Sequence, residues 1–559
     1  MYNILIGGKA GQGIDTTVGI LEKLLKKSGY NVFTVNDLMS RIRGGHNFSL
    51  IRFGSQVILS HSRKLDGIIA LDNETVELHK HELKPKGFIL GDSSLETQDE
   101  RVQKIDMNEM AKKLGNSRVA GVIAIGALLK IFGANLDYFN DVIKTFLDEK
   151  YVDINIQAVH EGYNSVENKF PHIQGAFGDW MTINGNQAVA LGAIAAGLRF
   201  YAAYPMSPST SIMAYLASKS EEAGIVVEQA EDEIAAINMA IGASFAGARA
   251  MTGTSGGGLC LMVEALGLSG IAEIPVVVVD CQRPGPATGL PTRTEQGDLQ
   301  FVISAAQGEF PRMVIALRHH TDAFYQTVRA LNLAEKYQIP VIILSDQYLC
   351  DTSATVKPYD LSNIEMIKPA AEKTGDGEYL RYRLTEDGIS PRLVPGKTKN
   401  LVAIDSDEHD ERGWITESAD MRIKMVNKRM KKLEKLAEEL QEPEFIGSPD
   451  FETLFVGWGS TYGPIAEAVA LLNGEHGGKY AALVFGDIYP LPQKMLLEKA
   501  ARAKQIVNVE QNATGQLASL IRAQTSMVCT SSILKYDGRQ ITGEEIVERI
   551  RATASERGI

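Results

Sequence analysis

The chain has 559 residues, of which 44% are hydrophobic and 23% charged, and its net charge is −12 at pH 7. One hydrophobic core cannot serve this length, so we expect three or more domains of ordinary globular composition. The negative charge argues against nucleic acid as the main partner, and the sequence holds no apolar run of about twenty residues that would cross a membrane. The amino terminus reads as a strand rather than a signal peptide, which indicates a cytoplasmic protein.

The first predicted domain covers residues 1–180 and begins with a strand, a glycine loop, a helix and a strand, the order of a βαβ unit. The two strands are expected at residues 3–6 and 30–35, with the loop at 7–13 and the helix at 16–27. Further strands are expected at residues 48–53, 67–71 and 87–90.

A mixed segment, residues 154–182, is expected to be the linker to a second α/β domain at residues 181–354. There a helix at 187–199 leads into a strand at 200–204. The run PVVVVD at 275–280 has the β-branched composition of a buried parallel strand. Further strands are expected at residues 225–227 and 339–345.

A polar insertion at residues 355–449 is charged and interrupted by Gly and Pro, and it ends in a helix at 421–440 that we expect at the surface. The last domain, residues 450–559, is again α/β, and the three α/β domains show no fixed repeat. Its strands are expected at residues 453–458, 481–485 and 505–509.

The loop GGKAGQG at residues 7–13 is the first candidate ligand site. Small residues such as Gly11 and Gly13 let the backbone approach a phosphate, and the following helix offers N–H groups. The spacing is not the G-x-G-x-x-G fingerprint, and only ND at 36–37 comes near the ribose-binding acid, which disfavours NAD. A phosphate-bearing ligand and plain strand–helix packing remain the alternatives. The segment RIRGGHN at 41–47 would supply cations to such a ligand or be solvated.

The segment YPMSPST at residues 204–210 is the most distinctive loop of the chain. Each proline, Pro205 among them, fixes its own φ and pushes the preceding residue out of the helical region. We therefore expect a rigid loop at the end of a strand, with the hydroxyl groups of Tyr204 and Ser207 presented outward.

An acidic helix follows that loop and starts with four carboxylates, at Glu228, Glu231, Asp232 and Glu233. For any one of them, compensation of the helix dipole is a sufficient explanation. Glu233, however, stands at the edge of the small apolar run IAAINMAIGA. We expect its carboxyl group to be buried, which suits a group that shares a proton.

Two more polar loops follow in the second domain. TGTSGGG at residues 252–258 contains Thr254 and Ser255, and it is either a helix start facing a ligand or a structural turn. A long prolyl loop at 282–298 comes after the predicted strand at 275–280, at the carboxyl end where open α/β sheets bind ligands.

Arg283 and Arg293 in this prolyl loop would each form a bidentate pair with a substrate carboxylate, unless they are solvated at the surface. Thr292 lies beside the second of them.

The four cysteines are isolated, so no C-x-x-C pair indicates a local Fe–S or zinc site. We expect them to be small buried side chains in a reducing compartment. They are Cys260, Cys281, Cys350 and Cys529. GDG at 375–377 with Asn400 imitates a thiamine diphosphate motif, but no hydrophobic strand leads into it, and we interpret it as a turn.

These motifs, in this order, resemble the 2-oxoacid:ferredoxin oxidoreductases, specifically an alpha subunit with a fused gamma domain. The segments that resemble the gamma domain are GGKAGQG at 7–13 and RGGH at 43–46. Those that resemble the alpha chain are GNQAVALGA at 185–193, the loop at 204–210, TGTSGGG at 252–258, GLPTRTEQGD at 289–298 and VEQNATGQL at 509–517. The resemblance covers nearly the whole chain.

The resemblance implies three folds: a Rossmann-like gamma-type domain, a thiamine diphosphate pyrimidine-type domain and a C-terminal transketolase-C-like domain. It implies a thiamine diphosphate site shared with a beta subunit, which carries Mg²⁺ and a [4Fe–4S] cluster and passes electrons to ferredoxin. Coenzyme A is the implied co-substrate, and the assembly is expected to be an (alpha–beta)₂ heterotetramer. The chain alone is then inert.

The motif match places Glu233 at the glutamate that contacts the pyrimidine ring and Arg293 at the arginine for the substrate carboxylate. Pro205, Thr254 and Ser255 fall on the cofactor side, and Tyr204 and Thr292 on the substrate side. Gly11 and Gly13 are assigned to coenzyme A. Ser207 replaces the family's threonine, which keeps a hydroxyl group and loses a methyl group. Met206 replaces an isoleucine, a tolerable apolar change.

The substrate is expected to be 2-oxoglutarate or a broad range of 2-oxoacids, with pyruvate, branched-chain and aryl 2-oxoacids as alternatives. Two other hypotheses stay open on the sequence: an NAD-dependent dehydrogenase that uses the first domain, and a non-catalytic scaffold subunit.

Overall fold

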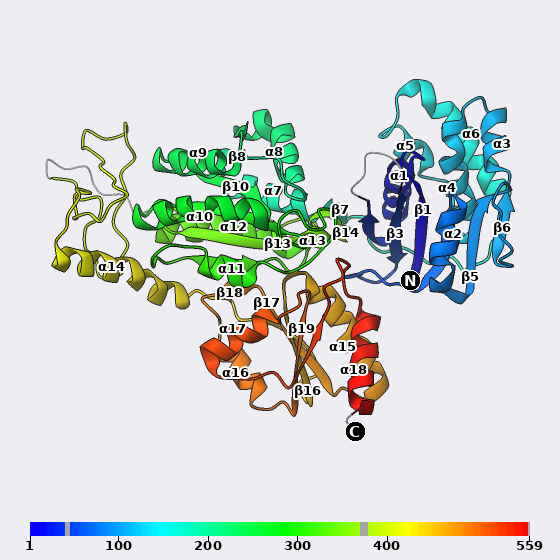
Figure 1. The fold of residues 1–559 in the computed structure, drawn as a ribbon. Helices are drawn as coiled ribbons and strands as arrows, with labels where there is room; N and C mark the ends of the chain where they lie inside the picture. The colour runs from blue at the N-terminus through cyan, green and yellow to red at the C-terminus, as the bar shows by residue number, and fades with distance from the viewer. Residues whose placement is uncertain (40–44, 369–377, 557–559) are drawn as a thin grey trace. The chain divides into compact units, whose positions relative to one another are not determined.

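The computed structural model describes residues 1–39, 45–368 and 378–556. The chain forms two compact units, one of residues 1–183 with 352–358 and one of residues 184–351 with 359–559. Three sheets with helices between their strands confirm the predicted α/β class (Figure 1). RIRG at 41–44 and the GDG turn at 375–377 lie outside the described residues.

The first unit is built on an eight-stranded sheet in the order β6-β5-β4-β1-β3-β2-β14-β7. Its strands are β1 Tyr2–Lys9, β2 Asn31–Asp37, β3 His46–Gly54, β4 Leu65–Ala70, β5 Leu83–Asp92, β6 Val102–Ile105, β7 Met181–Asn184 and β14 Ser353–Val356. Its helices are α1 Ile14–Lys27, α2 Asn73–His79, α3 Met107–Lys113, α4 Ala120–Ile131, α5 Phe139–Ile143 and α6 Glu149–Asn164. Alternate residues of β1 face two cores: Ile4 and Ile6 join the cluster with α1 and α4, whereas Leu5 joins Val76 of α2.

The predicted βαβ unit is split, because β3 lies between β1 and β2 and runs antiparallel to both. The strand of this sheet that comes last in the chain, β14, lies beyond residue 351 and pairs with β2. Thr355 Oγ1 accepts a hydrogen bond from the backbone N–H of Val32 at 2.9 Å. The first unit is therefore completed by residues distant in sequence.

The expected linker at 154–182 is wrong for its first part, because residues 149–164 form α6. The side chains of Val152, Asn155 and Val159 are buried at helical spacing, and α6 packs along α4. The polar residues between them hide this stripe in a short window of sequence.

The second unit contains a seven-stranded sheet in the order β18-β12-β13-β11-β10-β8-β9, parallel except for β18. Its strands are β8 Phe200–Ala203, β9 Val226–Gln229, β10 Ala250–Thr254, β11 Val276–Gln282, β12 Met313–Ala316, β13 Pro340–Asp346 and β18 Asp487–Tyr489. Its helices are α7 Gly185–Ala195, α8 Thr210–Ala223, α9 Glu233–Phe245, α10 Gly256–Ile271, α11 Leu299–Ser304, α12 His320–Tyr337 and α13 Gln347–Asp351. The central strand β11 is buried along its whole length, as its valine run predicts.

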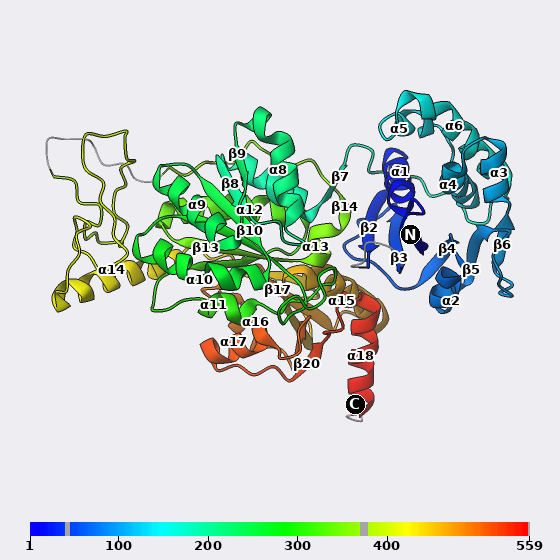
Figure 2. The same ribbon diagram turned by 45° about the horizontal axis from the view of Figure 1, so that its top comes forward.

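A five-stranded sheet in the order β15-β17-β16-β19-β20 forms the C-terminal part of the same unit. Its elements are β15 Glu444–Gly447, β16 Thr453–Trp458, α15 Tyr462–His476, β17 Tyr480–Phe485, α16 Lys494–Ala500, β19 Gln505–Glu510, α17 Gln516–Thr525, β20 Ser531–Leu534 and α18 Gly543–Glu556. Leu259 of α10 and Leu483 of β17 belong to one hydrophobic cluster, so the two sheets share a core. Helix α18 lies along α15 (Figure 2).

Residues 359–418, as far as they are described, form loops that end in α14 Ala419–Ala437 (Figure 1). One face of α14 is solvated, and the other buries Met425, Lys428 and Lys432 against the rest of the unit. Among the helices of the described ranges, none has the length and apolar character needed to cross a membrane.

Candidate functional site

Four polar loops meet at the carboxyl edge of the seven-stranded sheet. They follow β8, β9, β10 and β11, whose parallel order brings their carboxyl ends to one edge. Ligands of open α/β sheets bind at such an edge. This position agrees with the loops that the sequence singled out at 204–210, 228–233, 252–258 and 282–298.

The loop at 204–210 is held by hydrogen bonds from Asn186, a residue of α7 that was not among the predicted site residues. Asn186 Nδ2 donates to the carbonyl of Pro208 at 2.8 Å and to Ser211 Oγ at 2.6 Å, and its side chain is buried. Tyr204 and Ser207 are exposed, as predicted, and Pro205 is half-buried. The only sequence signal for Asn186 was its place in the GNQ segment at 185–187.

Glu233 is the first residue of α9, and its side chain is only 4% exposed. The preceding Asp232 caps the helix by accepting a hydrogen bond from the backbone N–H of Ala235 at 2.7 Å. Asp232 therefore serves the helix, and Glu233 is the buried carboxylate, as the sequence predicts. Glu233 Oε1 is buried and has no hydrogen-bond partner among the described residues.

The turn from β10 into α10 forms the wall that Glu233 faces. A side-chain Cβ at Gly258 would lie 2.6 Å from Glu233 Oε1 and 2.1 Å from Thr254 Oγ1, so only glycine lets these groups approach the helix start. Thr254 and Ser255 are fully buried, and Ser255 Oγ has no partner within the described ranges. The structure thus brings Glu233, Thr254 and Ser255 together around the start of α10.

The prolyl loop after β11 is joined to the loop at 204–210 by Arg283, whose Nη1 donates to the carbonyl of Ser207 at 2.7 Å. Arg293 lies further along, in a turn where its N–H donates to the carbonyl of Leu290 at 3.0 Å. The stem of Arg293 packs on Gly538, since a Cβ there would lie 3.1 Å from that of Arg293. Both Arg293 and Thr292 are half-buried.

The segment VEQNATGQL at 509–517 has a structural role in this arrangement. Gln296 of the prolyl loop donates from Nε2 to the carbonyl of Trp458 at 2.8 Å and accepts from the backbone N–H of Gln511 at 3.1 Å. Glu510 accepts from Trp458 Nε1 at 3.0 Å and from the N–H of Leu517 at the start of α17. The C-terminal sheet therefore holds the prolyl loop in place.

Helices α9 and α10 present apolar side chains to solvent next to this site. Ile234 is 51% exposed, Met239 41% and Leu261 51%. Cys260 of α10 is also exposed and Cys529 is half-buried, so the expectation that all four cysteines are buried is wrong for these two. An exposed apolar face beside a buried polar site is typical of a surface that another protein covers.

In the first unit, residues 7–9 of the expected loop belong to β1, and only residues 10–13 form the turn into α1. Gly11 and Gly13 have φ values of 94° and 78°, which favour glycine, and a Cβ at either would meet no atom within 4 Å. Gln12 closes the loop: Oε1 accepts from the N–H of Lys9 at 2.6 Å, and Nε2 donates to the carbonyl of Leu71 at 3.2 Å.

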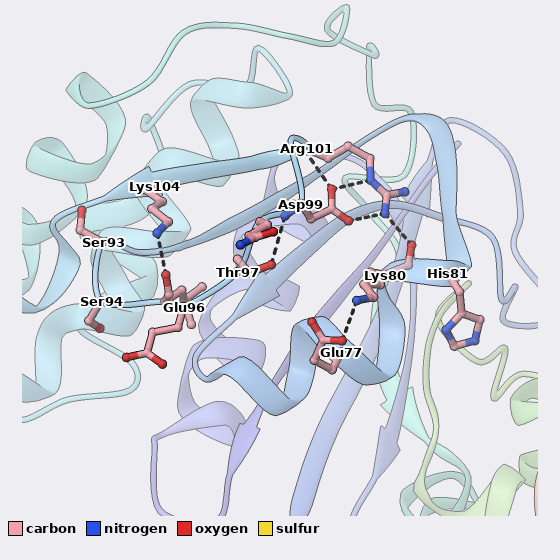
Figure 3. A pocket seen from close by; sticks show the side chains of 12 residues that line it. Glu77, Lys80, His81, Ser93, Ser94, Glu96, Thr97, Asp99, Arg101 and Lys104 are labelled. Carbon is pink, nitrogen blue, oxygen red and sulfur yellow. Dashed lines mark hydrogen bonds and ion pairs between the residues drawn. The ribbon is translucent and has the colours of Figure 1, made fainter.

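A broad polar hollow of about 1090 Å³ lies elsewhere in the first unit, beyond the end of β5 (Figure 3). Its cations already have partners. Arg101 binds Asp99 at 2.6 Å and holds the pKa of that carboxyl at about 2, Lys80 binds Glu77 at 2.6 Å, and Lys104 donates to the carbonyl of Leu95 at 2.6 Å. None of the predicted site residues lines this hollow.

Within the described ranges, no group of three or more His, Cys, Asp and Glu side chains converges in a way that would hold a metal ion.

Two family models match the chain. Residues 191–428 match the family described as pyruvate flavodoxin/ferredoxin oxidoreductase, thiamine diphosphate-binding, and residues 3–165 match pyruvate ferredoxin/flavodoxin oxidoreductase. The first match contains Glu233 and all four loops of the carboxyl edge. The second contains the loop at 7–13.

Relatives that match most or nearly all of the chain are also found. The 2-oxoacid:ferredoxin oxidoreductase subunit alpha of Sulfolobus sp is 33% identical, over 98% of this chain and 96% of that one. The 2-oxoglutarate oxidoreductase subunit KorA of Mycobacterium tuberculosis is 30% identical, over 88% of this chain and 78% of that one.

Among solved structures, a 2-oxoglutarate:ferredoxin oxidoreductase from Magnetococcus marinus, with 2-oxoglutarate, coenzyme A and succinyl-CoA bound, superposes with a TM-score of 0.93. Its sequence is 32% identical, and the match covers 99% of both chains. Fold, length and motif order agree. The chain therefore belongs to the family of 2-oxoacid:ferredoxin oxidoreductase alpha subunits.

Proposed function

We propose that this chain provides the pyrimidine side of a thiamine diphosphate site and that, with a beta subunit, it oxidatively decarboxylates a 2-oxoacid. The observation that carries the proposal is the buried Glu233 carboxyl, whose Oε1 has no partner in the described part of the chain and faces the cradle at Gly258. A buried polar atom without a partner costs free energy, which a ligand atom in this place would offset.

The residues fit a thiamine pyrimidine ring. Glu233 would hold a proton at the ring nitrogen N1′, and Thr254 and Ser255 would line the ring beside it. When bound, thiamine diphosphate supplies the nucleophilic carbon that attacks the 2-oxo group. This chain's contribution is to orient the ring and to keep water from the Glu233 carboxyl.

The site is half of a whole. The diphosphate, Mg²⁺ and the [4Fe–4S] cluster are assigned to the beta subunit, which would cover the exposed apolar residues Ile234, Met239 and Leu261 of α9 and α10. Ferredoxin would take electrons from that subunit. An (alpha–beta)₂ assembly in the cytoplasm follows from the same family pattern.

We propose 2-oxoglutarate as the substrate and coenzyme A as the acyl acceptor. The whole-length structural relative binds both, and a relative of this chain is named for 2-oxoglutarate. Tyr204 and Ser207 would face the substrate from the loop at 204–210, and Thr292 and Arg293 from the prolyl loop. The open space above Gly11 and Gly13 supports placing coenzyme A at the loop of the first unit.

The purified chain alone is expected to reduce no ferredoxin, because its site lacks the diphosphate half. Adding the beta subunit, thiamine diphosphate, Mg²⁺, 2-oxoglutarate and coenzyme A should start ferredoxin reduction, followed by absorbance. A panel with pyruvate, branched-chain and aryl 2-oxoacids ranks the substrates by kcat/KM. Turnover without thiamine diphosphate, or with NAD as the acceptor in its place, would overturn the proposal.

Gly258→Ala is expected to abolish most of the activity of the assembled enzyme, because the new methyl group would lie 2.6 Å from Glu233 Oε1 and 2.1 Å from Thr254 Oγ1. Gly257→Ala is the matched control one residue earlier, since its Cβ would meet only the carbonyl of Ala287 at 3.8 Å. Steady-state assays of both variants, assembled with the beta subunit, test the cradle. Equal activity of the two variants would show that the activity does not depend on the space that Gly258 leaves for the Glu233 carboxyl.

A further inference from the structure

The turn between β20 and α18 places a glycine against the prolyl loop, and the function described above gives this glycine no role. Gly538 is buried, and its φ of 78° lies in the left-handed region that favours glycine. A Cβ there would lie 3.0 Å from Leu290 Cδ1, 3.1 Å from Arg293 Cβ and 3.3 Å from Arg293 Cγ. Carbon atoms in contact prefer a separation of about 3.5 Å or more, so a side chain at this position would push Leu290 and Arg293 aside.

Hydrogen bonds fix the backbone that follows Arg293 on two sides. The N–H of Thr294 donates to the carbonyl of Gly538 at 3.1 Å. Thr294 Oγ1 accepts from the N–H of Tyr348, in α13, at 3.2 Å, and the side chain of Thr294 is buried. The chain at Arg293 is therefore held between the turn of the C-terminal sheet and the carboxyl edge of the seven-stranded sheet.

The turn that carries Gly538 is itself tied to α18 by ion pairs. Lys535 is buried, and its Nζ lies 2.9 Å from Asp537 Oδ2 and 3.1 Å from Glu545 Oε1. Asp537 Oδ1 accepts from the N–H of Arg539 at 3.0 Å, which closes the turn around Gly538. The turn is thus fixed to the helix that follows it.

The contact between Gly538 and Arg293 lies on the arginine stem. The position of Cγ defines the first side-chain torsion, and that torsion sets the direction in which the guanidinium group extends. An arginine stem is flexible and packs on neighbouring surface while its charged end reaches a partner. Backbone that touches Cβ and Cγ therefore limits the directions that are open to the guanidinium group of Arg293.

We propose that Gly538 and the turn around it position Arg293, and that the C-terminal sheet in this way sets the place of the substrate carboxylate. The inference rests on the proposed role of Arg293 in binding that carboxylate. Gly538 leaves room for the Arg293 stem to lie against the turn, and the hydrogen bond from Thr294 keeps the two segments in register. Gly538 is a positioning residue, since it acts through Arg293 and not on the substrate.

Gly538→Ala is expected to raise KM for the 2-oxoacid about tenfold and to change kcat much less. The reason is that a displaced Arg293 binds the substrate less well, while the Glu233 carboxyl stays in place. The assay uses the assembled enzyme and the 2-oxoacid with the highest kcat/KM in the panel above.

Gly477→Ala is the matched control. Gly477 ends α15 in the same C-terminal part of the chain with a φ of 68°, but a Cβ there would meet no atom within 4 Å. Both variants carry the strain of an alanine in the left-handed region, so their difference in KM isolates the contact with the prolyl loop. Gly477→Ala should keep the wild-type KM.

Asp537→Ala reaches the turn without a change at a left-handed residue. It removes the ion pair with Lys535 and the acceptor for the N–H of Arg539, and the Asp537 side chain is 58% exposed, so no core is lost. It should raise KM about threefold, because the turn is loosened rather than blocked. Thermal unfolding of the three variants identifies any general loss of the fold, and Asp537→Ala decides the question if Gly538→Ala does not assemble.

A double-mutant cycle shows whether the effect passes through Arg293. In an Arg293→Ala background, Gly538→Ala should no longer raise KM, because most of the stem that it displaces is absent. An effect of Gly538→Ala that adds in full to that of Arg293→Ala would contradict the inference. So would equal KM values for Gly538→Ala and Gly477→Ala, or a loss that is confined to kcat.

Arg293→Ala by itself separates the two levels of the argument. If this variant keeps the wild-type KM, the proposed role of Arg293 fails. If it raises KM while Gly538→Ala and Asp537→Ala do not, only the inference about Gly538 fails.

Discussion

Glu233→Gln in the assembled enzyme is expected to lower kcat by about 10²-fold or more, because the amide cannot exchange a proton with the ring nitrogen as the carboxyl does. The substitution keeps the size of the side chain and, with it, the packing against Gly258. Binding of thiamine diphosphate, measured by calorimetry on the assembled complex, should fall much less than kcat. The loss would then belong to catalysis rather than to folding or assembly.

Glu231→Gln is the matched control, two residues earlier at the same helix start. Its side chain is exposed, so the change removes an equal charge from the dipole region without touching the buried site. Wild-type activity in both variants would show that the chain acts as a scaffold and that proton transfer occurs elsewhere. A loss of equal size in both would mean that charge at the helix start, and not the buried carboxyl, matters.

The regular elements of this chain are largely predictable because their signals are local. The valine run of β11 and the strand β8, which ends just before the loop at 204–210, could be predicted from a few residues. Sheet membership is not local. The four-residue β14 pairs with β2 of the first unit, although the chain between them forms most of the seven-stranded sheet. The three-residue β18 pairs with β12 of the seven-stranded sheet, although it lies among the strands of the C-terminal sheet in sequence. Nothing within so short a strand specifies its partner.

The site shows the same division. Glu233 was identified because a carboxylate preceding a small apolar run predicts burial, and the structure places it there. Asn186 was missed. It acts through a contact across the fold, its hydrogen bond to the carbonyl of Pro208, for which a single sequence gives no periodic signal. Arg283 was one of two arginines weighed equally, and only the fold shows that it joins the two loops.

Helix α14 presents a different problem, since its lysines look like an ordinary solvated face. Lys428 and Lys432 are instead buried around Glu273, whose Oε1 lies 2.6 Å from Lys428 Nζ and whose Oε2 lies 2.5 Å from Lys432 Nζ. Arg381 donates to the carbonyl of Glu273 at 2.7 Å. Glu273 lies 155 or more residues before the two lysines in sequence, so helical spacing alone could not reveal the cluster.

One carboxylate faces two buried ammonium groups in this cluster. Burial lowers the pKa of Lys432 to about 7, while the two lysines hold the pKa of Glu273 below its ordinary range. The folded chain then binds fewer protons at Lys432 than the unfolded chain between about pH 7 and 10, so this group's penalty fades and stability rises with pH in that window. Lys432→Met should remove this rise and leave the anchoring pair of Lys428 and Glu273 intact.

Glu273→Gln is expected to lower the free energy of unfolding by about 3–5 kcal/mol, because it leaves Lys428 and Lys432 buried without a counter-charge. Urea unfolding of the chain at pH 7.5, with midpoints compared rather than extrapolated energies, measures the effect in a chain of two units. Lys435→Met, a change at an exposed position of α14, is the control for this helix. The double variant Glu273→Gln with Lys432→Met should recover part of the loss, since only one uncompensated cation remains. If Glu273→Gln unfolds at the wild-type midpoint, the insertion is held by its aromatic contacts, such as Tyr382 with His409 at 3.9 Å between ring centres, rather than by its buried charges.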